Sequence, residues 1–359
     1  MAIAHLGPLN LSSDLLLAPM MDITTPSYVL LIKYFGGLGL YSMPMVFINQ
    51  ISQAPKTMRP ILEFAEKHSP SSVQICGSGK SYETIHEALD VLNSYNFSVL
   101  DLNAGCPARH TCNSGGGASL MKPHRYKDLH HLIQSTIKLS TKPVSVKIRA
   151  GWDSKDGLDQ IVRMIEEEGA IFLTIHGRLA KQGYSGVVDI ETIKHVKEIS
   201  NIPVVGNGDV FNYHTYGLMK HITGVDAVMI GRAAMGFPET FAHITQQRDS
   251  MQEKRVIYGN LVSLFYQELD SEKPVNTPRE IQGYLKILLD SIESLGKYYN
   301  NDKFKLVELK RNAIWMIKGT YNSAKIREKV GKIRTLPVFL DYVFSSQLVS
   351  DLTPKTEMA

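Results

Sequence analysis

The segment Ser98–Pro107 reads SVLDLNAGCP, an apolar run that ends in a polar turn with a cysteine, and the glycines 115–117 follow soon after. A short apolar run bounded by turn residues predicts a buried β-strand. The turn then places the thiol of Cys106 on a loop at the end of that strand, where functional residues often lie. Taken alone, however, a cysteine is more often buried and structural, so the interpretation depends on the rest of the chain.

Similar apolar runs recur every few tens of residues, and each is followed by a segment of helical periodicity, which is typical of repeated βα units. Continuous apolar strands suit a parallel sheet covered on both faces. The eight predicted strands are 15–19, 39–42, 72–75, 99–103, 144–147, 172–175, 203–206 and 227–230. The eight predicted helices lie near 26–36, 57–68, 81–95, 124–140, 158–168, 190–200, 212–222 and 235–246.

Eight such units predict an α/β fold, a (β/α)8 TIM barrel over residues 1–246. A doubly wound open sheet is the alternative, but no Gly-x-Gly-x-x-Gly turn follows the first predicted strand. Beyond residue 246 the strand-like runs stop, and apolar residues return at helical spacing, as at Leu285, Leu288 and Ile292. We therefore predict a smaller all-α helical domain over 247–345 and a flexible tail over 346–359.

Composition narrows the class of protein. The chain has 359 residues and a net charge of +4, and it has no apolar run of the roughly 18–20 residues that span a bilayer. Its start lacks the pattern of a signal peptide, and its three cysteines form no Cys-x-x-Cys metal motif. We expect a cytoplasmic monomer with free thiols, no metal and no membrane contact.

Positive charge is concentrated near the C-terminus. The segment Lys303–Arg334 contains ten Lys or Arg and two Glu, a local charge of +8, so the rest of the chain carries −4. Such a segment can bind an anionic polymer, although a charge run is more often only a solvated helix face.

Polar residues gather where the predicted strands end, and in a (β/α)8 barrel these ends form the active site. Lys147, within an apolar strand, is costly to bury without a partner, which favours a functional role. His176, taken alone, is more often a satisfied core histidine. Together with the apolar Pro19 and Met20 after the first strand, the residues at the strand ends are Gln74, Asn103, Cys106, Lys147, Arg149, His176, Arg178, Asn207, Asp209 and Arg232.

Glycines close the last two predicted strands, at Gly206–Gly208 and at Gly231. Barrels of this kind commonly bind phosphate there on loop N–H groups, and Arg232 would add a charge-assisted hydrogen bond. Tight turns would explain one such loop, but two adjacent loops favour a phosphorylated cofactor. Lys147 beside it would stabilise developing negative charge.

In combination, these motifs resemble those of the tRNA-dihydrouridine synthases, flavin enzymes that reduce uridine in tRNA to 5,6-dihydrouridine. The resemblance extends from about residue 17 to residue 334. It rests on Ala18–Met20, Gln74, Asn103–Pro107 with Gly115–Leu120, Val146–Arg149, His176–Arg178, Tyr184, Gly206–Asp209, Gly231-Arg232 and the later Pro238.

The resemblance implies a role for each of these residues. FMN would lie across the barrel mouth, and Cys106 would be the general acid. Lys310 and Arg311, in a segment similar to the family's basic RNA-binding helix, would contact tRNA, and Asn103, Arg178 and Tyr184 would contact the target uracil. The cofactor-binding residues would be Pro19, Met20, Gln74, Lys147 and His176 at the ring, and Asn207, Gly208, Asp209, Gly231 and Arg232 on the phosphate side.

The implied reaction adds hydride to C6 of uracil from the flavin and a proton to C5 from a thiol, which is mostly protonated at neutral pH. NADPH, or NADH, would reduce the flavin again, and the target base would be flipped out of the tRNA. Two alternatives stay open. One is an FMN barrel that reduces a free pyrimidine and has no need of a basic domain, and the other is a non-catalytic tRNA-binding folding factor. The joint presence of Cys106, Lys147 and His176 favours chemistry.

Overall fold

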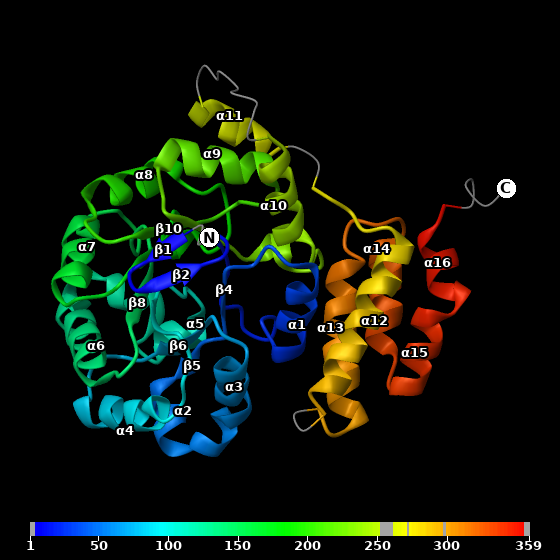
Figure 1. The fold of residues 1–359 in the computed structure, drawn as a ribbon, viewed down its shortest axis with the longest axis horizontal. Helices are drawn as coiled ribbons and strands as arrows, with labels where there is room; N and C mark the ends of the chain where they lie inside the picture. Colours follow the sequence, from blue (N-terminus) through cyan, green and yellow to red (C-terminus); the bar gives the residue numbers. More distant parts are fainter. Residues whose placement is uncertain (1–3, 252–260, 271–272, 297–298, 355–359) are drawn as a thin grey trace.

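The computed structural model describes residues 4–251, 261–270, 273–296 and 299–354. It contains a closed barrel of parallel strands, which confirms the predicted (β/α)8 fold (Figure 1). Strand β11 pairs with β3 and closes the barrel. In order around it, the strands are β3 (Leu15–Leu17), β4 (Leu40–Ser42), β6 (Ser71–Cys76), β7 (Val99–Ala104), β8 (Val144–Arg149), β9 (Leu173–His176), β10 (Val204–Asn207) and β11 (Ala227–Ile230).

Helices surround the barrel, and each of the eight predicted helices is present with its ends within a few residues of the prediction. Their apolar residues recur every three or four positions, so each helix buries one face against the strands. These helices are α1 (Pro26–Phe35), α3 (Pro55–Lys67), α4 (Tyr82–Asn93), α6 (Tyr126–Leu139), α7 (Leu158–Glu167), α8 (Ile190–Ile199), α9 (Tyr213–Thr223) and α10 (Thr240–Met251). The short elements β5 (Val46–Phe47), α2 (Ile48–Gln53) and α5 (Arg109–Asn113) were not predicted.

A two-stranded hairpin, β1 (Ala4–Leu6) and β2 (Leu9–Leu11), covers one end of the barrel. Its leucines form a second core with inward-facing residues from the starts of the strands, among them Leu16, Leu40 and Val205. The hairpin therefore seals the amino-terminal end and lies in front of the barrel strands in Figure 1. The opposite end, where the strands finish, is left for the polar residues.

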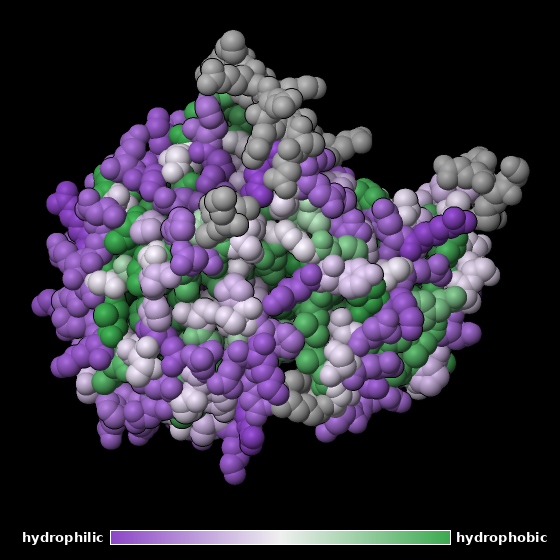
Figure 2. Space-filling model, in the orientation of Figure 1, coloured by the Kyte–Doolittle hydropathy of each residue, from purple (hydrophilic) through white to green (hydrophobic). Residues whose placement is uncertain are grey.

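After the barrel the described chain is helical. Helix α11 (Leu261–Glu268) packs on α9, and α1 packs on α12, the first helix of a bundle beside the barrel (Figure 1). More hydrophobic residues are visible over this bundle than over the outer helices of the barrel (Figure 2). The bundle consists of α12 (Pro278–Ser294), α13 (Asp302–Met316), α14 (Ser323–Lys332), α15 (Leu336–Phe344) and α16 (Ser346–Leu352). None of the described helices is long and apolar enough to cross a membrane.

The predicted flexible tail over 346–359 is wrong for its first half. Residues 346–352 form α16, and Leu348 and Leu352 are buried against the bundle. These two leucines are four residues apart, so they lie on one face of a helix, and burying them repays the entropy of ordering the segment. Residues 355–359 of that prediction lie outside the described residues.

We expect the replacement Gly39→Ala to destabilise the barrel by about 1–3 kcal/mol, because a Cβ at this position would lie 2.0 Å from the carbonyl oxygen of Ser13. Denaturant unfolding of the purified variant measures this loss. The control is Gly217→Ala in α9, where a Cβ meets nothing within 4 Å. Helix propensity predicts that this control is stabilised by about 0.5–1 kcal/mol. Equal stability of the two variants would contradict the packing argument.

Candidate active site

A hydrogen-bonded network lines the inside of the barrel from β6 to β8. The buried carboxylate of Asp101 accepts hydrogen bonds from Gln74 Nε2 (2.7 Å) and Ser145 Oγ (2.6 Å). Gln74 Oε1 in turn accepts from Asn103 Nδ2 (2.8 Å). Both ends of the Gln74 amide are therefore fixed. Its carbonyl oxygen in turn orients the side chain of Asn103, at the end of β7.

Lys147 brings a positive charge into the same interior. Its Nζ donates to Asn207 Oδ1 across the barrel (2.9 Å), and Asn207 Nδ2 donates to the carbonyl of Met229 (2.7 Å). Burial lowers the pKa of Lys147, and the charge of Asp101 opposes this effect. Burial likewise raises the pKa of Asp101, while its hydrogen bonds and Lys147 lower it in part. Each group thus stabilises the charged form of the other.

The loop after β7 holds Cys106 at the strand end, as the sequence predicts. Asn103 Oδ1 accepts from the backbone N–H of Gly105 (3.1 Å) and of Cys106 (2.8 Å). The carbonyl of Cys106 accepts from the N–H of Ala118 (2.9 Å). Gly117 lets this contact form, since a Cβ there would lie 2.6 Å from that carbonyl oxygen, and its φ is +57°. The glycine cluster and the cysteine therefore form one unit.

The thiol of Cys106 is partly exposed and lies 3.5 Å from Thr111 Oγ1. Cys112, on the same loop, directs its thiol to the carbonyl oxygen of Cys106 at 3.6 Å. Cys76 is buried, and burial raises the pKa of its thiol to about 12. Of the three cysteines, Cys76 is thus the structural one, and Cys106 stands at the mouth.

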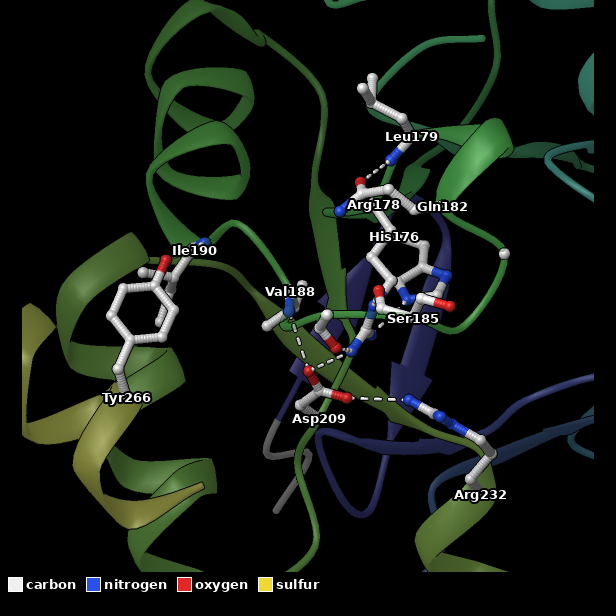
Figure 3. Close-up of polar contacts among 12 residues, drawn as sticks. His176, Arg178, Leu179, Gln182, Ser185, Val188, Ile190, Asp209, Arg232 and Tyr266 are labelled. Carbon is white, nitrogen blue, oxygen red and sulfur yellow. Dashed lines mark hydrogen bonds and ion pairs between the residues drawn. The ribbon is translucent and has the colours of Figure 1, made fainter. Parts of the chain in front are cut away.

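Asp209 joins two arginines at the ends of β9 and β11 (Figure 3). Its Oδ2 binds Arg178 Nη2 (2.6 Å), and its Oδ1 binds Arg232 Nη2 (2.8 Å). Oδ2 also accepts from the N–H of Val188 (2.8 Å). Arg232 is 47% exposed, whereas the side chain of Arg178 is only 2% exposed. The family resemblance implies a uracil contact for Arg178. In the structure, however, most of its N–H donors are engaged within the chain, by Asp209, Gly186 O, Ser185 O and His176 Nε2.

His176 lies beneath this arginine cluster. It is buried, and burial together with the charges of Lys147 and three arginines lowers its pKa well below the usual value. The imidazole is therefore neutral at physiological pH and can accept or donate a hydrogen bond. Tyr184 is 60% exposed, and its ring centroid lies 6.4 Å from that of His176 and 4.7 Å from the guanidinium of Arg232. Tyr184 thus stands over the mouth.

The loop after β3 carries Pro19 and Met20. Thr24 Oγ1 donates to the carbonyl of Ala18 (3.0 Å) and accepts from the N–H of Met20 (3.0 Å). A Cβ on Gly231 would meet Met20 Sδ at 3.6 Å, so the ends of β3 and β11 are adjacent. Residues 18–25, which we call the Met20 loop, therefore lie next to Arg232.

The structure separates the two basic residues predicted to bind tRNA. Lys310 Nζ donates to the carbonyls of Gly331 and Ile333, both at 2.7 Å, and so caps the end of α14. Arg311 Nη1 donates to the carbonyl of Asp22, in the loop after β3. Arg311 therefore lies beside the barrel mouth, whereas Lys310 is engaged inside the bundle.

The residues at the mouth fit an anionic cofactor that is rich in hydrogen-bond acceptors, such as a flavin nucleotide. Four cations meet there, Lys147, Arg149, Arg178 and Arg232, with the carboxylates of Asp101 and Asp209 as their acidic neighbours. Lys147 has a single hydrogen-bond acceptor among the described residues, although an ammonium has three donors. A half-buried, incompletely paired cation is costly. An anionic group rich in hydrogen-bond acceptors would complete this donor set.

Sequence reasoning missed Asp101, although a signal was present. Residues of equal parity in a strand share a face, so Asp101 lies on the same face as Asn103, and Ser145 on the same face as Lys147. The bonds from Asp101 to Gln74 and Ser145 are the result of that alternation.

The depressed pKa of His176 predicts acid instability. The unfolded state binds a proton below about pH 6.5 while the folded state does not, so stability falls as the pH is lowered through that value. This group contributes a loss of about 1.4 kcal/mol per pH unit. Urea unfolding of the apoprotein between pH 7 and pH 5 measures the slope. We expect His176→Asn to flatten it, whereas His214→Asn, at an exposed site on α9, should leave it unchanged. Identical slopes for His176→Asn and the wild type would contradict the prediction.

Solved structures show what is shared at the level of the fold. Histamine dehydrogenase from Rhizobium sp. 4-9 matches 79% of this chain with a TM-score of 0.53 and 12% identity. A 6-hydroxypseudooxynicotine amine oxidase from Pseudomonas geniculata N1 matches 69% with a TM-score of 0.54 and 11% identity. The chain spans about half the length of each of these structures, 50% and 49%. At this identity the likeness shows the fold alone.

Sequence comparison extends over the bundle as well. A probable tRNA-dihydrouridine synthase from Rickettsia bellii is 28% identical over 326 residues, covering 90% of this chain and 92% of that protein. A tRNA-dihydrouridine synthase B from Xanthomonas campestris is 33% identical over 243 residues, covering 67% and 71%. The family model described as Dihydrouridine synthase (Dus) matches residues 16–336, which include every strand of the barrel except for the first residue of β3. The chain therefore belongs to the dihydrouridine synthase family, whose members are flavin-dependent oxidoreductases.

Proposed function

We propose that this protein is a tRNA-dihydrouridine synthase, which reduces the C5=C6 bond of uridine in tRNA with FMN as cofactor and NADPH, or NADH, as reductant. One observation carries the proposal. Asn103 holds the loop of Cys106 at the end of β7, and it pairs in register with Lys147 on β8. The proposed proton donor and a half-buried cation are thus carried by paired positions of neighbouring strands, at a cation-rich mouth.

Cys106 is the proposed general acid. Bound flavin supplies the hydride that C6 of the uracil receives. The thiol of Cys106 gives its proton to C5, on a loop that Asn103 and the contact with Ala118 hold in place. A positioned acid of this kind contributes about 10²–10⁴-fold to the rate.

Lys147 and His176 are proposed to bind the flavin ring. The ammonium of Lys147 has donors to spare and would stabilise negative charge at the ring. Burial, together with its cationic neighbours, lowers the pKa of His176 and keeps it neutral, so it would offer a hydrogen bond without adding charge. Pro19, Met20 and Gln74 are the remaining ring contacts in the proposal. For the phosphate we propose Asn207, Gly208, Gly231 and Arg232, with Asp209 as the cofactor-site residue that orients Arg232.

Asn103 and Tyr184 are the proposed uracil contacts. Tyr184 is exposed and offers an aromatic face to a flipped-out base. Arg178 remains among the proposed substrate-binding residues. Because it bonds to Asp209 and His176, its main proposed contribution is to orient these two side chains.

Residues 247–345 are the proposed tRNA-binding region. The protein itself is proposed to be a cytoplasmic monomer. Arg311 lies beside the mouth and remains in the proposal as a tRNA contact. For Lys310 the two carbonyl acceptors support a structural role instead. Lys318, just after α13, and Lys325, on α14, are exposed and complete the proposed tRNA-binding surface.

The replacement Cys106→Ala should leave the yellow flavin bound and reduce dihydrouridine formation in tRNA by about 10²-fold or more, because the proton donor is lost. Visible absorbance measures flavin content, and mass spectrometry of digested tRNA measures product. Cys112→Ala is the matched control and should stay within a few-fold of the wild type. A fully active Cys106→Ala enzyme would exclude the assigned acid. Reduction of free uridine as efficient as that of tRNA would favour the alternative of a free-pyrimidine reductase.

The charge reversals Lys318→Glu and Lys325→Glu should weaken tRNA binding and reduce its salt dependence, since each removes a cation that displaces counterions from phosphate. Filter binding of tRNA across a range of salt concentrations measures both. Lys138→Glu makes the same change at an exposed position near the end of α6, which lies at the amino-terminal end of the barrel. If this control weakened binding as much, the proposed surface would be wrong.

A further inference from the structure

A buried carboxylate joins the helical bundle to the barrel. Glu308, on α13, is only 4% exposed, and it faces the start of α1. Its Oε1 accepts hydrogen bonds from the hydroxyl groups of Thr25 and of Ser27, the latter at 2.9 Å. Its Oε2 lies 3.3 Å from Arg311 Nη1. One side chain of the bundle therefore binds the first turn of a barrel helix.

The same contact continues into the Met20 loop. Arg311, which pairs with Glu308, also donates to the carbonyl of Asp22. Thr24 then holds the backbone on both sides of Pro19, through the carbonyl of Ala18 and the N–H of Met20. The connected groups run without a break from α13 to the loop proposed to face the flavin ring.

The packing of the bundle against the barrel does not require the charge of Glu308. The two parts already meet through apolar packing of α1 on α12, for example between the rings of Phe35 and Tyr284, whose centroids are 5.5 Å apart. A buried carboxylate costs desolvation free energy that apolar residues of similar size avoid. Four hydrogen-bonding groups nevertheless converge on Glu308, from Thr25, Ser27, Arg311 and Asn312. Such a contact specifies geometry more than it adds stability.

We infer that Glu308 is a positioning residue that sets the Met20 loop through Thr25, Ser27 and Arg311, and so couples occupancy of α13 by tRNA to flavin binding in the barrel. The inference rests on the proposed function for the identity of the two ligands. Because coupling is reciprocal, tRNA on α13 should tighten flavin binding by the same factor by which flavin tightens tRNA binding. The Glu308 contact is the physical link between the two sites.

The test uses Glu308→Gln, which keeps the size of the side chain and an acceptor for Ser27 but loses the charge opposite Arg311. Hydrogen exchange of the apoprotein is measured for residues 18–25, and FMN affinity is measured by titration with and without tRNA lacking dihydrouridine. Glu293→Gln, an exposed position on α12, is the matched control. The exchange measurement requires no activity, so it stays informative even if the proposed reaction is wrong.

We expect Glu308→Gln to speed exchange in residues 18–25 while the bundle keeps its protection. FMN binding should weaken about fivefold or more, and the effect of tRNA on it should shrink toward none. In turnover, kcat should fall more than KM for tRNA rises. Ser27→Ala acts through the same contact, so the double variant Ser27→Ala/Glu308→Gln should lose less than the sum of the single losses.

Two results would overturn the inference. Unchanged exchange and FMN affinity in Glu308→Gln would show that the Met20 loop does not depend on this contact. Loss of protection throughout the bundle, with tRNA still tightening FMN binding as in the wild type, would make Glu308 a residue of stability alone. Failure of the wild-type enzyme to reduce tRNA would instead refute the proposed function.

Discussion

The ammonium of Lys147 lies inside the barrel, on Asn207 Oδ1 and within the field of the Asp101 carboxylate. A cation in this position is tolerated only with acceptors and opposite charge nearby. The barrel supplies them by making the half of its interior near the strand ends polar, while the half next to the hairpin is apolar. The charge that the proposed chemistry requires therefore dictates how the interior is filled.

Hydrogen bonds connect the Asp101 carboxylate to the loop of Cys106, the proposed general acid. Asp101 holds one end of the Gln74 amide, the other end accepts from Asn103, and Asn103 holds the loop of Cys106. The proposed cofactor side and the proposed proton-donating side of the mouth thus belong to one network. On the opposite wall Asp209 has the same function, because it joins Arg178 to Arg232. Two buried or half-buried acids organise a site whose working groups are mostly cations.

Local patterns predicted the barrel well. The strands and helices around it recur with strong apolar periodicity, and parallel strands place their ends together, so the site at Asn103, Cys106, Lys147 and His176 could be expected from order along the chain alone. Other features could not be predicted from local patterns. The β1–β2 hairpin is too short to show a pattern, α16 gains its stability by burying Leu348 and Leu352, and Lys310 was taken for a free cation although its carbonyl acceptors lie on another helix.

The sequence by itself therefore determined the fold, the strand ends and the residue types that meet there, because periodicity and strand order are local properties of the chain. The tertiary structure decided which of those residues are available. Arg178 is buried against Asp209, and Lys310 caps α14. Glu308 reaches the start of α1, at Thr25 and Ser27, from 283 and 281 positions away. Hydrogen bonds between segments so distant depend on how the bundle packs against α1, and no local pattern in the sequence records that packing.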